Sequence, residues 1–74
     1  MTHCRGHDFE EDFAGSSATQ WYARKDGFPV DCTTTQVGGS VRVQIDGGSL
    51  ASGNILTIYD NNDKLVATYE LIDC

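Results

Sequence analysis

Residues 40–74 read SVRVQIDGGSLASGNILTIYDNNDKLVATYELIDC, and the clearest periodicity of the chain lies in this stretch. Val41, Val43 and Ile45 alternate with Arg42 and Gln44. A period of two places one face of a strand in a core and the other in water. We therefore expect a strand over residues 40–45.

Two more strands are predicted downstream, NILTIY over residues 54–59 and KLVATYELI over residues 64–72. Residues 46–54 are rich in glycine and serine, which predicts a wide loop with Leu50 packed on the core. Residues 60–63, DNND, form the other turn. In the last strand the alternation predicts two sides, one with Leu65, Ala67, Tyr69 and Leu71 and the other with Val66, Thr68, Glu70 and Ile72.

Upstream, TQWYARK over residues 19–25 and FPVDCT over residues 28–33 are predicted to form a hairpin. Asp26 and Gly27 between them favour a type I′ turn. Pro29 cannot donate a ladder hydrogen bond, so its strand is expected at an edge. Contact of Trp21 or Tyr22 with Phe28 would form a buried aromatic nucleus. Residues 33–39, TTTQVGG, are either a polar loop or an edge segment.

About five strands at spacings of about ten residues predict an all-β or β-rich α+β fold with one small antiparallel sheet, curled or half-barrel. An immunoglobulin-like sandwich is disfavoured, because 74 residues are few for the about seven strands of that fold. We divide the chain into an acidic N-terminal segment, residues 1–17, and a single small β domain, residues 18–74.

The N-terminal segment sets Asp8, Glu10, Glu11 and Asp12 around two phenylalanines, Phe9 and Phe13. A spacing of four places both phenylalanines on one face of a helix, which permits one amphipathic turn docked on the sheet. The alternative is a frayed terminus.

Eleven acidic against five basic residues give a formal net charge of −6. This charge repels nucleic acid and anionic membranes, so neither is an expected ligand. The charge either keeps the protein in solution or forms a surface that meets a basic partner. No run of about 18 apolar residues and no secretory signal is present, so we expect a cytoplasmic protein.

His3, Cys4 and His7 are weak candidates for zinc ligands, because no second matched pair accompanies them. We expect no metal and no cofactor. Three cysteines allow at most one internal bridge. All three are free in a reducing cytosol, whereas an oxidising compartment would favour a bridge between Cys32 and Cys74.

No nucleophile-elbow, phosphate-loop or calcium-loop signature is complete, so we expect no enzyme activity. The leading hypothesis is a small acidic binding or inhibitor protein that occupies a basic surface of a protein or nucleoprotein partner, including one that normally holds nucleic acid. In size and charge, without any shared motif, the chain resembles phage-encoded inhibitors of bacterial defence, the anti-CRISPR and DNA-mimic proteins. That resemblance implies the cytoplasm of a host cell.

The expected partner-binding residues are the acidic ones near the N-terminus and the turns: Asp8, Glu10, Glu11, Asp12, Asp26, Asp31, Asp60 and Asp63. The protein is expected to be a monomer or a weak homodimer. Two alternatives remain. One is a structural or assembly β module, such as a virion or surface component, that joins neighbours through a strand edge. The other is a zinc-stabilised regulatory domain.

Overall fold

A computed structural model describes all residues, 1–74, and contains eight strands and one short 3-10 helix. The elements are β1 (Thr2–Cys4), β2 (Phe9–Ala14), β3 (Tyr22–Lys25), β4 (Phe28–Val30), β5 (Thr33–Val37), β6 (Ser40–Ile45), η1 (Gly47–Leu50), β7 (Ile55–Tyr59) and β8 (Leu65–Ile72). The all-β class is confirmed. None of the helical structure is long and apolar enough to cross a membrane.

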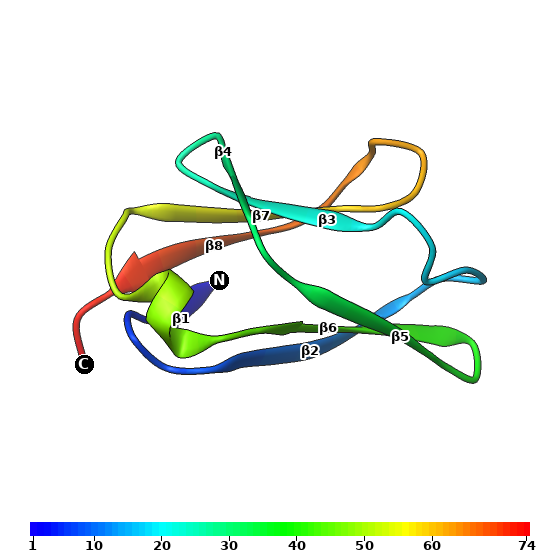
Figure 1. Ribbon diagram of the computed structural model, residues 1–74, viewed down its shortest axis with the longest axis horizontal. Helices are drawn as coiled ribbons and strands as arrows, with labels where there is room; N and C mark the ends of the chain where they lie inside the picture. The colour runs from blue at the N-terminus through cyan, green and yellow to red at the C-terminus, as the bar shows by residue number, and fades with distance from the viewer.

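The strands form two sheets that face each other (Figure 1). A five-stranded sheet has the order β1-β8-β7-β3-β4, and a three-stranded sheet has the order β2-β6-β5. All pairs are antiparallel except β1 with β8. The two layers replace the single curled sheet that strand spacing suggested, because the chain crosses between the sheets at residues 5–8, 15–21, 31–32 and 46–54.

The acidic segment is a strand, so the predicted helical turn is wrong. Residues Phe9–Ala14 form β2 and pair in register with β6, with Phe9 opposite Ile45 and Phe13 opposite Val41. A spacing of four is also a multiple of two, so a strand places both phenylalanines on one face as a helix does. Phe9 is buried. Its ring packs edge-on against the ring of Tyr69 in the facing sheet, with 4.9 Å between the two ring centroids.

The core lies between the two sheets and is built by the alternation expected for residues 40–45 and 64–72. Its buried members are Phe9, Trp21, Ala23, Val41, Val43, Ile45, Leu50, Leu56, Ile58, Ala67, Tyr69 and Leu71. Leu50 is fully buried, which confirms its predicted place. Leu65 departs from the pattern and is half exposed, since the ladder between β7 and β8 shifts beside Tyr59.

The predicted aromatic nucleus is wrong. Trp21 is buried, and its indole N–H donates to the Ser17 carbonyl at 2.8 Å. Phe28 instead pairs with Lys25 at the end of the hairpin and is 74% exposed. Tyr22 lies on the outer side of β3, where its ring stacks on the ring of Tyr59 with 4.8 Å between the two ring centroids.

The strand predicted over residues 28–33 divides between the sheets. Its first part, β4, belongs to the five-stranded sheet, and the chain then crosses at Asp31 and Cys32 into β5 of the three-stranded sheet. The unassigned residues 33–39 are therefore the edge strand β5 and a two-residue Gly38–Gly39 turn that leads into β6.

One disulfide joins Cys4, at the end of β1, to Cys74, the last residue, with 5.6 Å between the two Cα atoms. The predicted pair Cys32–Cys74 is wrong, and Cys32 is free and half-buried. The parallel pairing of β1 with β8, with Cys4 opposite Ile72, brings the two ends of the chain together. Arg5 adds a second link, donating to the Asp73 carboxylate at 2.8 Å.

Candidate functional site

The charge of the protein is divided unevenly between the two sheets. Residues 7–14 and 31–49, which build the three-stranded sheet and its loops, carry six acidic residues and one basic residue, Arg42. The rest of the chain carries five acidic and four basic residues. The first half therefore has a formal charge of −5 and the second of −1, which together give the −6 of the whole chain. Net charge concentrated in this way creates a directed negative potential.

Five of these residues, here called the acidic face, lie on or beside the outer side of the three-stranded sheet: Asp8, Glu10, Asp12, Asp31 and Asp46. Glu10 and Asp12 point outward from β2 because they alternate with the inward-facing Phe9 and Phe13. Each successive outward position along a strand lies about 7 Å from the last. The strand therefore displays two carboxylates, Glu10 and Asp12, on one side about 7 Å apart.

Arg42 is the one positive charge on the three-stranded half. Its guanidinium donates to both carboxylate oxygens of Asp12, at 2.9 and 3.2 Å, in the forked geometry that arginine favours. This hydrogen bond, together with the negative charge of Asp12, raises the pKa of Arg42. Both side chains remain partly in water, so the pair contributes little to stability and stays open to another partner.

The other carboxylates are oriented by neutral donors. Gln44 donates to Glu10 at 2.7 Å across the β2–β6 pair. The Gly47 amide donates to Asp8 at 2.7 Å, and the Gly48 amide donates to Asp46 at 3.0 Å. None of these donors carries a charge, so the negative charges of Glu10, Asp8 and Asp46 are held in place without being neutralised.

Gly47 is the residue that lets η1 approach β2. A Cβ atom at this position would overlap the Gly6 carbonyl oxygen and lie 2.9 Å from the Asp8 amide nitrogen. The contact fixes Asp8 next to η1, and the Asp46 side chain caps the same turn. Asp46 was not among the partner-binding residues predicted from the sequence. The signal was its place directly after a predicted strand and before two glycines, a pattern typical of a capping residue.

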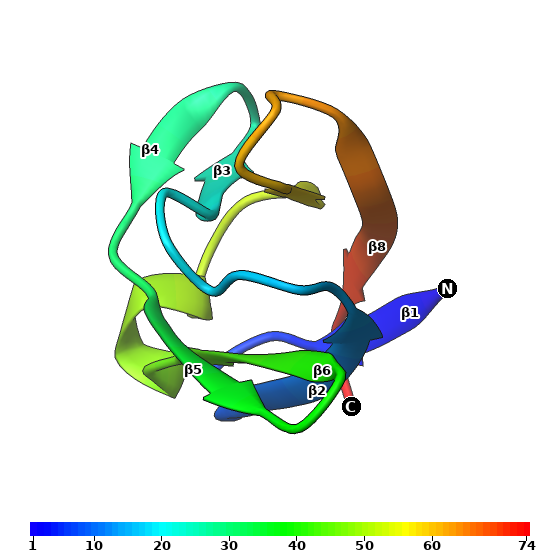
Figure 2. The ribbon, with the colours of Figure 1, turned by 90° about the vertical axis from the view of Figure 1, so that its right-hand side faces the viewer.

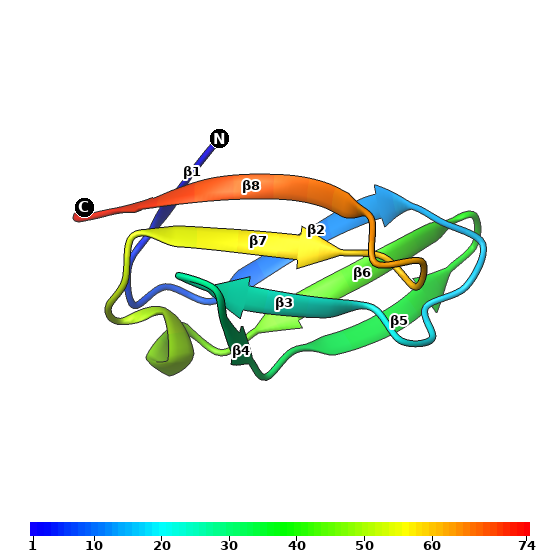
Figure 3. The same ribbon diagram turned by 90° about the horizontal axis from the view of Figure 1, so that it is seen from above.

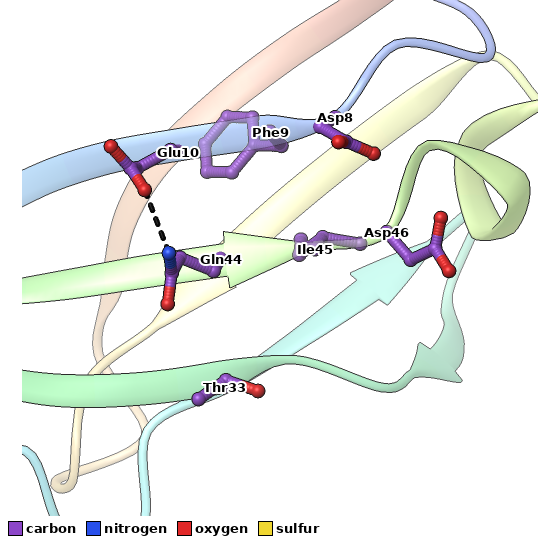
Figure 4. A pocket seen from close by; sticks show the side chains of 7 residues that line it. All are labelled: Asp8, Phe9, Glu10, Thr33, Gln44, Ile45 and Asp46. Carbon is purple, nitrogen blue, oxygen red and sulfur yellow. Dashed lines mark hydrogen bonds between the residues drawn. The ribbon is translucent and has the colours of Figure 1, made fainter.

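Two shallow, open hollows run along this face and share Thr33, Gln44 and Asp46. The larger, of about 400 Å³, includes Asp8 and Glu10, and the smaller, of about 280 Å³, includes Asp31. Figure 4 shows Glu10 and Gln44 turned toward one another, with Asp8 and Asp46 at the other end of the hollow. Small-molecule sites are mostly apolar and enclosed, so this lining fits the surface of a macromolecule better.

Glu11 lies on the other side of β2, opposite the buried Val43, and its side chain is exposed. Burial raises the pKa of the Tyr69 phenol, and the negative charge of Glu11 raises it further. The Glu11 side chain therefore lies on the side of β2 that faces the other sheet, and it is not part of the acidic face.

Three of the predicted partner-binding residues lie on the other half of the molecule. The Asp26 carboxylate accepts the amide N–H groups of Asn54 and Ile55, at 3.0 to 3.2 Å, and so ties the β3–β4 turn to β7. Asp60 accepts the amides of Asn62 and Lys64 within its own turn. Asp63 lies beside Tyr22, whose pKa is raised by desolvation and then by this carboxylate. Asp26 and Asp60 thus shape turns.

The zinc candidates do not form a site. The Cys4 sulfur is in the disulfide, and a His3 ring nitrogen lies 2.8 Å from the His7 carbonyl oxygen. No group of three or more histidine, cysteine, aspartate or glutamate residues is arranged to hold a metal ion. Burial raises the pKa of the free Cys32 thiol, which disfavours the thiolate that a nucleophile needs.

No protein-family model, no curated protein and no solved structure matches this chain.

Proposed function

We propose that this protein is a non-enzymatic binding or inhibitor protein, and that its acidic face occupies a basic surface of a macromolecular partner. The observation that carries the proposal is the division of charge, with six acidic residues and a single arginine on the three-stranded half. Arginine and lysine side chains of the partner supply the opposite charges.

The form of the face supports a basic groove as the target. Glu10 and Asp12 project from the same side of β2 about 7 Å apart, and Asp8, Asp31 and Asp46 lie beside them, so the face offers the partner several carboxylates. A nucleic-acid-binding surface gathers arginine and lysine side chains, because duplex DNA presents one phosphate charge about every 1.7 Å of its axis, and such cations can also meet carboxylates. The proposal therefore includes competition with nucleic acid, as in the anti-CRISPR and DNA-mimic proteins that the chain resembles in size and charge.

The disulfide bears on where this binding takes place. A bridge such as Cys4–Cys74 persists in oxidising surroundings, whereas a reducing cytosol keeps thiols free. The cytoplasmic location, in a host cell if the chain is phage-encoded, stays a prediction. Thiol labelling of protein taken directly from its native compartment tests it: three labelled cysteines support the cytoplasm, and one labelled cysteine contradicts it.

The test of function compares two variants with the same change in charge. One carries Glu10→Gln, Asp12→Asn and Asp31→Asn on the acidic face, and its matched control carries Asp63→Asn, Glu70→Gln and Asp73→Asn on the other half. Each is immobilised, exposed to bacterial lysate and washed at low and then high salt, and the retained proteins are identified by mass spectrometry. The control is expected to retain the same basic partner as the unmodified protein.

We expect the acidic-face variant to lose that partner, and salt to release it from the unmodified protein, because salt screens exposed charges beyond about 8 Å at physiological ionic strength. Equal retention by both variants would remove the acidic face from the interface. Loss from both would mean that only the total charge matters, which would contradict the proposed face.

A further inference from the structure

Four strands end the two sheets, and three of them, β1, β2 and β4, have features that hinder pairing with another chain; β1 covers only the Glu70–Ile72 end of its neighbour β8. β1 and β4 have only three residues each, and Pro29 in β4 has no N–H to donate. β2 carries Glu10, Glu11 and Asp12 in succession. Short length, proline and charge are the usual devices that keep a sheet edge from adding a foreign strand.

The fourth edge, β5, has none of these devices. Its sequence is TTTQV, five residues without a charge or a proline, and it ends the three-stranded sheet (Figures 2 and 3). Apart from the ladder with β6, its residues take part in no backbone–backbone hydrogen bond. The outer N–H and C=O groups of β5 are therefore open to a partner strand.

We propose that β5 pairs antiparallel with β5 of a second copy, around a two-fold axis at Thr35. Val37 and Ser40 flank the two-residue turn, so alternation directs the backbone groups of Thr34 and Gln36 outward. In the symmetric register, Thr34 of one copy exchanges hydrogen bonds with Gln36 of the second copy. The two Thr35 residues then lie side by side as a pair without hydrogen bonds, and the surfaces are self-complementary.

Charge does not oppose a second copy as the occupant despite the net charge of −6, and the uncharged β5 is self-complementary in this register. In this register Asp31 faces Gly39, and no charged residue faces another. The carboxylates of β2 are two strands away from the β5 edge. In the six-stranded sheet the two β2 strands are five strand spacings apart, about 24 Å, which exceeds the screening length of about 8 Å.

The pairing has a consequence for the acidic face that goes beyond the proposed function. Residues directly opposite each other in an antiparallel pair point to the same side of the sheet. The outer sides of both three-stranded sheets, and with them the two acidic faces, therefore lie on one side of the dimer. Such a dimer presents two equivalent acidic faces at a fixed separation.

The test is sedimentation velocity of the intact, oxidised protein over concentrations from about 5 µM to about 1 mM, because association depends on protomer concentration. We compare Thr35→Glu with Thr68→Glu. Thr35 is opposite Arg42 within its own copy, so a glutamate is tolerated in the monomer but places two like charges together at the two-fold axis. Thr68 is also exposed but lies on β8 of the other sheet, opposite Thr57 of β7, so its change adds the same charge on the sheet that does not contain β5.

We expect the mass of the unmodified protein and of Thr68→Glu to rise with concentration from 8.1 kDa to twice that value, while Thr35→Glu stays monomeric. An unmodified protein that is monomeric at the highest concentration would overturn the proposal, as would a Thr35→Glu variant that dimerises equally well. A Thr35→Cys variant in a Cys32→Ser background gives a second readout. It is expected to form an intermolecular disulfide on mild oxidation, and failure to do so would contradict the register.

Discussion

The two sheets share a core but differ in their charged side chains. In the five-stranded sheet and its loops, carboxylates are bonded to nearby amides and cations: Asp26 and Asp60 hold turns, and Asp73 binds Arg5. In the three-stranded sheet one carboxylate, Asp12, meets a cation, and the others accept neutral donors or none. Carboxylates accept backbone amides in both halves, so the halves differ mainly in their balance of charge: six acidic residues against one arginine on the three-stranded half, and five against four basic residues on the other.

The two sheets also differ in where the disulfide and the longest sheet edges lie. The disulfide lies at the β1–β8 side of the five-stranded sheet, whereas the longest edges, β2 and β5, belong to the three-stranded sheet. The covalent constraint and the two longest sheet edges therefore lie on different sheets of the molecule.

The largest effect is expected from the disulfide. Cross-linking residues 70 positions apart removes enough entropy from the unfolded chain to stabilise the fold by about 4 kcal/mol. The core of a domain this small contributes only about 3 to 5 kcal/mol of net stability. Cys74→Ser is therefore expected to leave the protein close to unfolding. Urea titrations followed by the fluorescence of the buried Trp21 measure the loss.

Cys32→Ser is the control, because the Cys32 thiol is free. Its urea midpoint is expected to stay close to that of the unmodified protein. If Cys32→Ser and Cys74→Ser lower the midpoint equally, the disulfide is not what holds the five-stranded half together.

Next in size is truncation of the core from either sheet. Ile58 of β7 and Val43 of β6 are both completely buried. Ile58→Ala is expected to cost about 3 kcal/mol and Val43→Ala about 2 kcal/mol, in proportion to the methyl and methylene groups removed. Both values come from the same urea titrations, with the exposed Leu65→Ala as a control expected to cost less than about 0.5 kcal/mol.

Similar losses of unfolding free energy in Ile58→Ala and Val43→Ala would mean that the sheets share one cooperative core and differ only at their surfaces. If Val43→Ala were nearly neutral, the three-stranded sheet would be packed loosely, and the comparison between the halves would become one of stability instead of charge.

Third is Asp26, the carboxylate that ties the β3–β4 turn to β7. Asp26→Ala removes an ionised acceptor of two backbone N–H groups and places alanine at a positive φ of 51°. Together these changes are expected to cost about 2 kcal/mol. Asp26→Asn keeps an oxygen acceptor and tolerates the left-handed backbone, so it is expected to recover most of the loss. Equal losses in the two variants would place the effect elsewhere.

The sequence predicted the elements whose period is unambiguous. The alternation in residues 40–45 and the apolar side of residues 64–72 both appear in the core. The acidic segment was ambiguous, because Phe9 and Phe13 share a face in a helix and in a strand alike, and only the pairing of β2 with β6 decides between them. The two-sheet division depends on the crossing at Asp31 and Cys32, which leaves no periodic signal.

The candidate site was predicted in part. Asp8, Glu10, Asp12 and Asp31 do lie on one half of the molecule, but a list of acidic residues cannot tell a carboxylate that caps a turn from one that faces a partner. Asp26 and Asp60, which hold turns away from the acidic face, were included, whereas Asp46, which caps η1 and also lines both hollows of the acidic face, was missed. The cysteine pairing also lay beyond the sequence, because Cys4 meets Cys74 only through the parallel pairing of β1 with β8.

The smallest effect on stability is expected at Asp12. This position tests most directly whether the two halves use their charges differently. Asp12→Asn removes the charge that meets Arg42 but leaves an oxygen that the guanidinium can still reach. Because the pair is partly exposed, water and salt already screen it. We expect its urea midpoint to match that of the unmodified protein, at low salt and at high salt. A loss as large as that of Asp26→Ala would make the Asp12–Arg42 pair a stabilising feature instead of a displayed one.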